Sequence, residues 1–210
     1  MGTTGRVLHR AAGYDFLVWL ITGGRERRFR EQLLSLARLQ HGELVLDVGC
    51  GTGSLAIAAK RQVGPTGSVD GIDASPKMIA RAVKKARKAD VDVVFRQALA
   101  EALPFPDGHF DVVLSTVMLH HLPRKARQEC ASEIRRVLKP GGRVLAVDFG
   151  SPSHAKRSLI AHFHRHGYTK LEDIIALLTG AGLETIESGA VGIKDLQFVL
   201  AGRLREATVP

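Results

Sequence analysis

The sequence has no apolar run close to the roughly 20 residues that a membrane-spanning helix needs. The apolar segment 17–21 is far too short, and a cluster of charged residues at 25–28 follows it closely. The first residues also lack the apolar segment and small-residue cleavage site of a secretory signal. We therefore expect neither a membrane span nor a secretory leader.

Cysteine is scarce, because Cys50 and Cys130 are the only two. They are too few for a disulfide framework, and their spacing is not that of a zinc site. Three histidines within 162–166 could bind a metal, but no carboxylate or cysteine adjoins them at ligand spacing. We expect a reducing, cytoplasmic setting and no metal site, and we assign the histidine run to the substrate pocket.

Aromatic residues make up only 5% of the chain, whereas its net charge is +9 and its isoelectric point is about 10.0. Basic residues cluster at 25–30, 84–88, 124–127 and 135–139. Such clusters attract nucleic acid, anionic lipid or acidic substrates. The scarcity of aromatic side chains leaves little for base stacking. We interpret the clusters as solvated faces of outer helices and do not favour nucleic acid as a partner.

From about residue 44 onward, short apolar runs typical of strands alternate with segments whose apolar residues have helical spacing. The expected strands are 44–48, 68–72, 91–95, 110–115, 144–149, 183–187 and 196–200, and the expected helices lie around 29–37, 55–59, 76–86, 125–138 and 169–178. Repeated strand–helix units predict an α/β fold, a doubly wound and mostly parallel sheet with helices on both faces. Only eight residues separate the last two strands, so we expect these two to pair antiparallel.

Short-range signals predict several element boundaries. Ser75-Pro76 is typical of a helix start, and Thr169 with Glu172 matches a capping box. Gly180 is expected to cap the C-terminus of that last helix. The Pro-Gly-Gly sequence at 140–142 is expected to stop the preceding helix and turn the chain into the next strand.

A glycine-rich loop follows the first strand and contains Gly49, Gly51 and Gly53. In open parallel sheets, ligands bind beyond the carboxyl ends of the strands, and glycines let the backbone pass close to them. A dinucleotide fingerprint would place its third glycine at Ser54 rather than at Gly53. The Gly-Lys-Ser/Thr ending of a phosphate-binding P-loop is absent.

Two carboxylates accompany this loop. Asp47 lies inside the motif, where it would repel a pyrophosphate but suit an ammonium or sulfonium group. Asp73 ends the second strand about twenty residues on, where a carboxylate can accept hydrogen bonds from both ribose hydroxyls. Together these features favour S-adenosylmethionine (SAM) over NAD as the ligand.

Five segments in the right order resemble the class I SAM-dependent methyltransferases, and most closely the group that contains the ubiquinone/menaquinone C-methyltransferases. They are 46–53, 71–78, 103–105, 110–113 with 119–122, and 138–142. The resemblance covers residues 44–149 closely and the C-terminal strands more loosely. It implies a seven-stranded sheet of order 3-2-1-4-5-7-6 with strand 7 antiparallel.

The resemblance also implies a SAM site at the carboxyl ends of the strands. The expected contacts are Asp47, Gly49, Gly51 and Gly53 around the amino-acid part, Asp73 on the ribose, Ala74 and Met78 beside the adenine, and Ser115 and Thr116 at the end of the fourth strand.

We expect residues 1–210 to form a single SAM-dependent methyltransferase domain. Residues 1–42 are interpreted as an N-terminal helical lid, 43–150 as the SAM-binding core, and 151–210 as a substrate-side segment with the C-terminal strands. Tyr14 is expected to fold over the SAM site from the lid.

Methyl transfer from a sulfonium needs an in-line nucleophile, and positioning can supply most of the catalysis. A base is needed where the nucleophile arrives protonated. His120 and His121 follow the fourth strand and Asp148 ends the fifth, so these three are the candidate catalytic residues. A purely structural role is the alternative for each of them.

The resulting interpretation is a SAM-dependent enzyme that methylates a small molecule on oxygen, nitrogen or activated carbon. An aromatic or quinone-like acceptor rests on analogy with the family alone. One alternative is an RNA or protein methyltransferase, which only the basic charge favours. A second is a SAM-binding module without catalysis.

Leu99 is a departure from the family pattern, in which an aspartate at this place accepts the adenine amino group. Leucine offers no such acceptor, although backbone groups of Leu99 and Ala100 can still contact adenine, and the Leu99 side chain can pack on the ring. We expect Leu99→Asp to strengthen SAM binding by about one neutral hydrogen bond, or about 1 kcal/mol. Calorimetric titration measures this, with Leu99→Ala as the control that adds no acceptor. An unchanged or lower affinity of Leu99→Asp would refute the idea.

Overall fold

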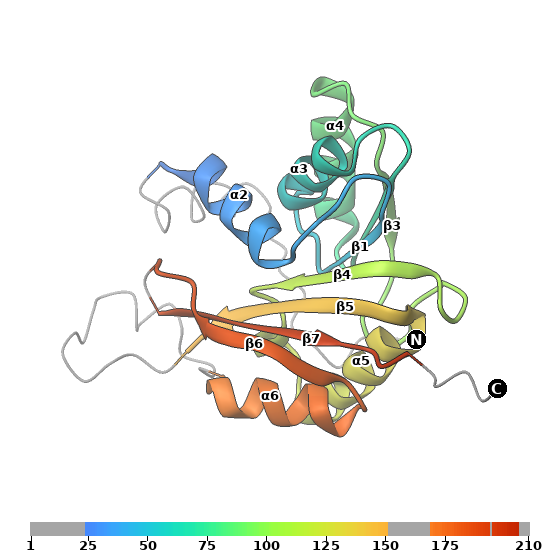
Figure 1. Cartoon of the computed structure of the whole chain (residues 1–210). Coiled ribbons are helices and arrows are strands. Elements are labelled where there is room, and N and C mark those ends of the chain that lie inside the picture. The colour runs from blue at the N-terminus through green and yellow to red at the C-terminus, as the bar shows by residue number, and fades with distance from the viewer. Residues whose placement is uncertain (1–23, 151–168, 194, 206–210) are drawn as a thin grey trace.

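The computed structural model describes residues 24–150, 169–193 and 195–205, and Figure 1 shows their arrangement. The strands are β1 (Leu44–Val48), β2 (Ser68–Asp73), β3 (Val94–Gln97), β4 (Phe110–Thr116), β5 (Leu138–Phe149), β6 (Glu184–Ala190) and β7 (Leu196–Gly202). The helices are α2 (Glu26–Leu36), α3 (Ser54–Val63), α4 (Pro76–Lys88), α5 (Arg124–Val137) and α6 (Leu171–Gly180), and η1 (Leu119–His121) is a single 3-10 turn.

The strands form one seven-stranded sheet of order β3-β2-β1-β4-β5-β7-β6. Strands β3, β2, β1, β4 and β5 pair in parallel, whereas β7 runs antiparallel to both β5 and β6. The predicted order and the predicted antiparallel pairing of the last two strands are therefore confirmed.

Helices cover the sheet on two faces, as Figure 1 shows for α3 and α4 against α5 and α6. Because side chains alternate along a strand, β1 directs Leu46 and Val48 into a core shared with α5 and α6. Its Val45 joins the other core, formed with α2 and α3. Burial on both faces explains why the parallel strands read as continuous apolar runs.

The third strand lies later than predicted, at Val94–Gln97 instead of 91–95. Asp90 takes a left-handed conformation, with φ of 51°, as the chain leaves α4. The Val91 amide still donates to the carbonyl of Ala86 in that helix. Pairing with β2 therefore begins only at Val94. The strand expected at 183–187 likewise begins later and runs to Ala190.

The capping predictions for the last helix are wrong. The helix begins at Leu171 with Lys170 in the capping position, and the Thr169 hydroxyl is buried without a hydrogen-bond partner. The Thr169 amide instead donates to the carbonyl of Phe149, which places it outside the helix. At the other end, Gly182 rather than Gly180 takes the left-handed conformation that ends the turn, with φ of 83°.

Two further boundary signals are confirmed only in part. Ser75 does occupy the capping position before Pro76, but its hydroxyl makes no capping hydrogen bond. The Pro-Gly-Gly sequence at 140–142 follows α5 directly, yet it lies inside β5 instead of ahead of it. The pairing of β4 with β5 shifts register there, which accommodates the extra residues.

Several expectations fall on residues outside those described: Tyr14 with most of the lid assigned to 1–42, and the histidine run at 162–166. The described part of that lid, α2, packs its apolar face against the core beside α3. None of the helices that the structure describes is long and apolar enough to cross a membrane.

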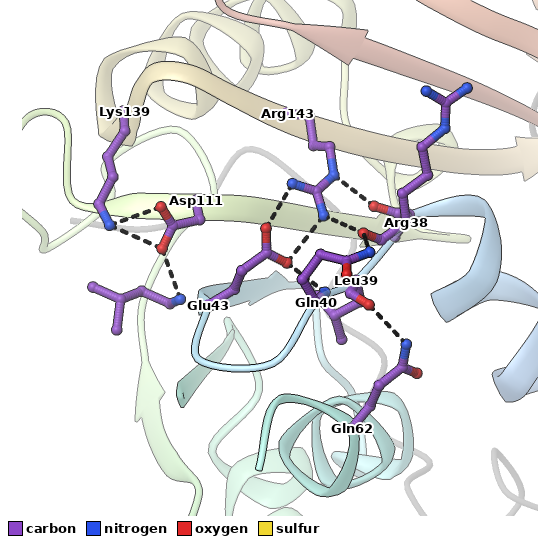
Figure 2. Close-up of polar contacts among 10 residues, drawn as sticks. Arg38, Leu39, Gln40, Glu43, Gln62, Asp111, Lys139 and Arg143 are labelled. Carbon is purple, nitrogen blue, oxygen red and sulfur yellow. Dashed lines mark hydrogen bonds and ion pairs between the residues drawn. The ribbon is translucent and has the colours of Figure 1, made fainter. Parts of the chain in front are cut away.

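A polar network at the amino ends of the parallel strands fastens the segment between α2 and β1 to the sheet (Figure 2). Arg143 on β5 donates to the carbonyl oxygens of Ala37, at 2.7 Å, and Arg38, at 2.6 Å. It also pairs with both oxygens of Glu43, at 2.8 and 3.0 Å. Lys139 and the Leu44 amide share Asp111 nearby. One guanidinium thus joins β5 to three residues of the incoming chain.

We expect Arg143→Ala to lower the free energy of unfolding by about 2–3 kcal/mol, because it leaves the Glu43 carboxylate and two carbonyl oxygens without their hydrogen-bond donor. Arg143→Lys keeps the charge but not the planar fork, so its loss should be smaller. Urea denaturation measures both. Arg27→Ala is the control, since its pair with Glu31 is exposed and its loss should leave the free energy of unfolding close to that of the wild type. Equal effects of Arg143→Ala and Arg27→Ala would contradict the role of Arg143.

Candidate cofactor-binding and catalytic site

Four parallel strands end at the same edge of the sheet and bring the predicted site residues together. Val48 lies beside Ile72 of β2 and Ser115 of β4, and Thr116 lies beside Val147 of β5. The glycine loop, Asp73, the end of β4 and Asp148 therefore share this edge. This is where ligands bind in open α/β sheets.

The glycine loop depends on the absence of side chains. Gly49, Gly51 and Gly53 have φ values of 75°, 54° and 76°, a region that side chains disfavour. A Cβ at Gly53 would lie 2.6 Å from Phe95 Cζ, and one at Gly49 would overlap Met118 Cγ. The loop is thus packed tightly between α4 and β3 on one side and the segment after β4 on the other.

Asp47 is the least satisfied charged group of this edge. Its side chain is buried, and its Oδ2 atom has no hydrogen-bond partner. Burial, together with the nearby charge of Asp73, raises the pKa of Asp47 to about 7, and a hydrogen bond from the Ala56 amide opposes this shift. An ammonium group placed here would supply the missing partner and favour the ionised carboxylate.

Asp73 organises the loop directly. Its Oδ2 accepts the Gly51 amide at 3.0 Å, and its Oδ1 accepts the Ser75 amide at 2.8 Å. Burial raises the pKa of Asp73, whereas these two hydrogen bonds lower it. A carboxylate has further acceptor sites, so Asp73 can hold the loop and still accept from a ribose hydroxyl.

Lys85 of α4 was not predicted as part of this region. Its Nζ donates to Thr52 Oγ1 and to Ser54 Oγ, both at 2.8 Å. These contacts tie α4 to the outer side of the glycine loop. No local pattern signals them, because more than thirty residues separate the partners.

The segment after β3 carries the residues expected beside adenine. Ala100 is buried, Leu99 is half-buried, and Leu99 forms an isolated bridge with Ala102. The Ala98 amide donates to the Asp73 carbonyl at 3.2 Å, which holds this segment next to the ribose-side carboxylate. Met78 packs inside, under the start of α4.

Two charged residues of α5, again not predicted, clamp the Leu103–Phe105 part of the same segment. Glu133 accepts the Leu103 amide at 2.7 Å. Arg136 donates to the carbonyl oxygens of Leu103 and Phe105, at 3.0 and 2.8 Å, and pairs with Asp107 and Glu133. The hydrogen bond from Arg136 is the main cause that lowers the pKa of Glu133.

The end of β4 supplies a second unsatisfied polar atom. The Ser115 hydroxyl is buried and has no hydrogen-bond partner, and Thr116 beside it is half-buried. Val117 then takes a left-handed conformation, with φ of 54°, which is a strained state for a β-branched residue. Strain and unpaired polar atoms gather at functional sites more often than elsewhere.

The structure brings His120 and Asp148 into direct contact. Asp148 is fully buried, and its Oδ1 lies 2.6 Å from His120 Nδ1. The His120 amide donates to Asp148 Oδ2 at 2.9 Å. The ring of His121 lies against that of His120, with 3.8 Å between the ring centres. All three candidate catalytic residues therefore form one cluster. Among the described residues, no three His, Cys, Asp or Glu side chains group closely enough to hold a metal ion.

Sequence comparison shows which proteins this part of the chain resembles. Residues 45–142 match a family described as "Methyltransferase domain". The ubiquinone/menaquinone biosynthesis C-methyltransferase UbiE of Pseudomonas fluorescens is 39% identical over 152 residues, which cover 70% of this chain and 58% of that protein. The chain is thus similar to SAM-dependent methyltransferases over most of its length.

Solved structures agree with this assignment. A SAM-dependent methyltransferase from Methanosarcina mazei superposes with a TM-score of 0.67 and 27% identity, covering 80% of this chain and 95% of that one. The [4+2]-cyclase SpnF superposes with a TM-score of 0.77 but is only 18% identical, covering 98% and 100% of the two chains, and shows the fold alone. The chain spans less than three fifths of the length of the UbiE proteins that it matches.

The raised pKa of Asp47 leads to a prediction about how the stability of the ligand-free protein depends on pH. Between the ordinary value of 3.8 and about 7, the folded state binds a proton that the unfolded state has lost. Stability from this group is therefore full below pH 3.8 and is lost as the pH rises to about 7. Asp47→Asn removes the titration, so above pH 7 the variant should be more stable than the wild type by up to roughly 4 kcal/mol.

Thermal and urea unfolding at pH 5 and pH 8 measure this difference, which should be larger at pH 8. The control is Asp92→Asn, which removes an exposed carboxylate before β3 and should leave the free energy of unfolding close to that of the wild type. Equal destabilisation by Asp47→Asn at pH 5 and at pH 8 would contradict the prediction. It would mean that the ionised Asp47 carboxylate has a partner that the described structure does not show.

Proposed function

We propose that this chain transfers a methyl group from SAM to a small-molecule acceptor in the cytoplasm. The observation that carries the proposal is the buried Asp47 carboxylate, whose Oδ2 lacks a partner beside a loop of left-handed glycines. An ammonium-bearing ligand satisfies that atom, and a dinucleotide does not. The two cysteines are unpaired and buried, which is compatible with a reducing compartment.

The residues of the edge fit the parts of SAM in order. Asp47 would pair with the ammonium group, and the glycine loop would leave room for the amino-acid chain. Asp73 would hold the ribose, and the segment from Leu99 to Ala100 would lie beside the adenine, with Ala74 and Met78. When bound, SAM supplies an electrophilic methyl group and a thioether leaving group. Ser115 and Thr116, which end β4, would line the space next to that methyl group.

The acceptor proposed is an aromatic or quinone-like molecule that is methylated on oxygen, nitrogen or activated carbon. Support comes from the names of the UbiE proteins, which refer to ubiquinone and menaquinone biosynthesis. We further propose that the part of residues 1–42 that precedes α2, with Tyr14, closes over the site and that 151–210 supply its acceptor side. Methylation of RNA or protein, and SAM binding without catalysis, gain no support from the comparisons.

Calorimetric titration with SAM and S-adenosylhomocysteine tests the proposal. We expect saturable binding to the wild type and a loss of at least tenfold in Asp73→Ala, because both the ribose contact and the anchor of Gly51 are removed. Asp92→Ala, on the exposed segment before β3, is the matched control and should bind normally. Circular dichroism establishes that each variant is folded. Absence of binding by folded wild-type protein would overturn the proposed function.

A further inference from the structure

Lys85 is the charged residue of α4 that reaches the glycine loop. Its Nζ donates to Thr52 Oγ1 and to Ser54 Oγ, both at 2.8 Å. Thr52 is buried, and Ser54 is the first residue of α3. Between them lies Gly53, whose φ of 76° is left-handed. One ammonium group therefore spans residues 52–54, the loop–helix turn by which the chain enters α3.

The same loop is also held at Gly51, where Asp73 Oδ2 accepts the amide at 3.0 Å. Three glycines in the left-handed region would give the loop many alternative conformations without such contacts. Fixing a binding loop before its ligand arrives lowers the entropy that is lost on binding. Asp73 and Lys85 thus order two successive parts of the loop, and their charges are opposite.

The two charges of an amino acid determine what this end of the site must bind. Under the proposed function, Asp47 pairs with the ammonium group of SAM. Asp47 also accepts the Ala56 amide in the first turn of α3, so that ammonium group would lie beside the start of α3. The carboxylate of the ligand is bonded to the same carbon atom as the ammonium group. It would therefore lie close to the start of α3 as well, where Asp47 and Asp73 repel it.

The start of α3 can offset this repulsion. Its first turn contains no acidic residue, and Gly53 in the capping position has no side chain to cover the end of the helix. A helix N-terminus carries a partial positive charge and amide groups that bind anions. Lys85 adds a full positive charge within hydrogen-bond distance of Ser54. A cation at this end is unfavourable for the helix alone, and a bound carboxylate reverses that effect.

We propose that Lys85 is a positioning residue for the amino-acid end of the cofactor, and that it selects ligands that carry a carboxylate there. This inference rests on the proposed function. The hydrogen bonds from Lys85 hold the loop–helix turn, and its charge lowers the electrostatic cost of placing a carboxylate near Asp47 and Asp73. Both effects use the contacts with Thr52 and Ser54 as they stand, so neither needs a further donor on Lys85.

Two ligands that differ only in the carboxylate test this assignment: S-adenosylhomocysteine and its decarboxylated analogue. Calorimetric titration gives the affinity of each, and the ratio of the two affinities isolates the contribution of the carboxylate. Lys85→Met removes the charge and both hydrogen bonds at nearly the same side-chain length. We expect it to lower the ratio about tenfold, because the carboxylate loses a nearby cation. Lys85→Arg keeps the charge and the donors and should restore most of the ratio.

Lys84→Met is the matched control, because Lys84 is the exposed neighbour of Lys85 on the same helix and its loss changes the net charge equally. It should leave both affinities unchanged. Circular dichroism and urea denaturation establish that each variant is folded.

Equal losses for the two ligands in Lys85→Met would mean that Lys85 only maintains the loop, and would overturn the inference. An unchanged affinity of Lys85→Met for S-adenosylhomocysteine would overturn it as well. Failure of the wild type to bind S-adenosylhomocysteine is a different result, which removes the proposed function itself.

Ser54→Ala shows whether Lys85 acts through the loop–helix turn, and it also tests the inference if Lys85→Met does not fold. The substitution takes away a partner that positions the Lys85 ammonium group, so the affinity ratio should fall, by less than in Lys85→Met. In the double variant the ratio should be no lower than in Lys85→Met alone, since coupled residues have non-additive effects. Additive losses would show that the two residues act independently and would overturn the role of Lys85 as a positioning residue.

Discussion

Parallel register between β1 and its two neighbours is the constraint on which the site depends. Val48 is level with Ile72 on one side and with Ser115 on the other. A slip of one residue would turn Asp47 into the opposite core and separate it from Asp73. Apolar side chains on both faces of β1 fix that register, since a slip of one residue would bury the carboxylate among the α5 and α6 side chains that pack on Leu46 and Val48 here. Hydrophobic packing thus sets the geometry of the polar edge.

The two edges of the sheet have opposite effects on the stability of the fold. The carboxyl edge holds the unfavourable features: an unpartnered Asp47 oxygen, a buried Ser115 hydroxyl without a partner, and a strained Val117. The amino edge holds the dense ion-pair and carbonyl network around Arg143. Such a division is expected where a site is kept ready for a ligand, because the cost of unpaired groups must be offset by stability elsewhere.

How far the sequence predicts this molecule depends on whether the signal is local. The buried strands and the spacing from Asp47 to Asp73 were predicted, since two-sided burial and the glycine loop leave a pattern in adjacent residues. β3 was misplaced because an exposed edge strand lacks that pattern, and because a non-glycine residue, Asp90, makes the turn before it. Lys85 and the Glu133–Arg136 clamp were missed, since their partners lie about thirty residues away.

The chain carries a net positive charge, whereas the candidate site contains two carboxylates. The two charges have little effect on each other because the basic side chains on the surface are screened by salt. The net charge of +9 includes exposed lysines and arginines on α4 and α5, such as Lys77, Lys84 and Arg124. Salt screens these over about 8–10 Å. Asp47 and Asp73 act at contact range and from a low-dielectric position, where screening is weak. The proposed binding of a cationic cofactor would therefore depend on the buried carboxylates and would be little affected by the basic surface.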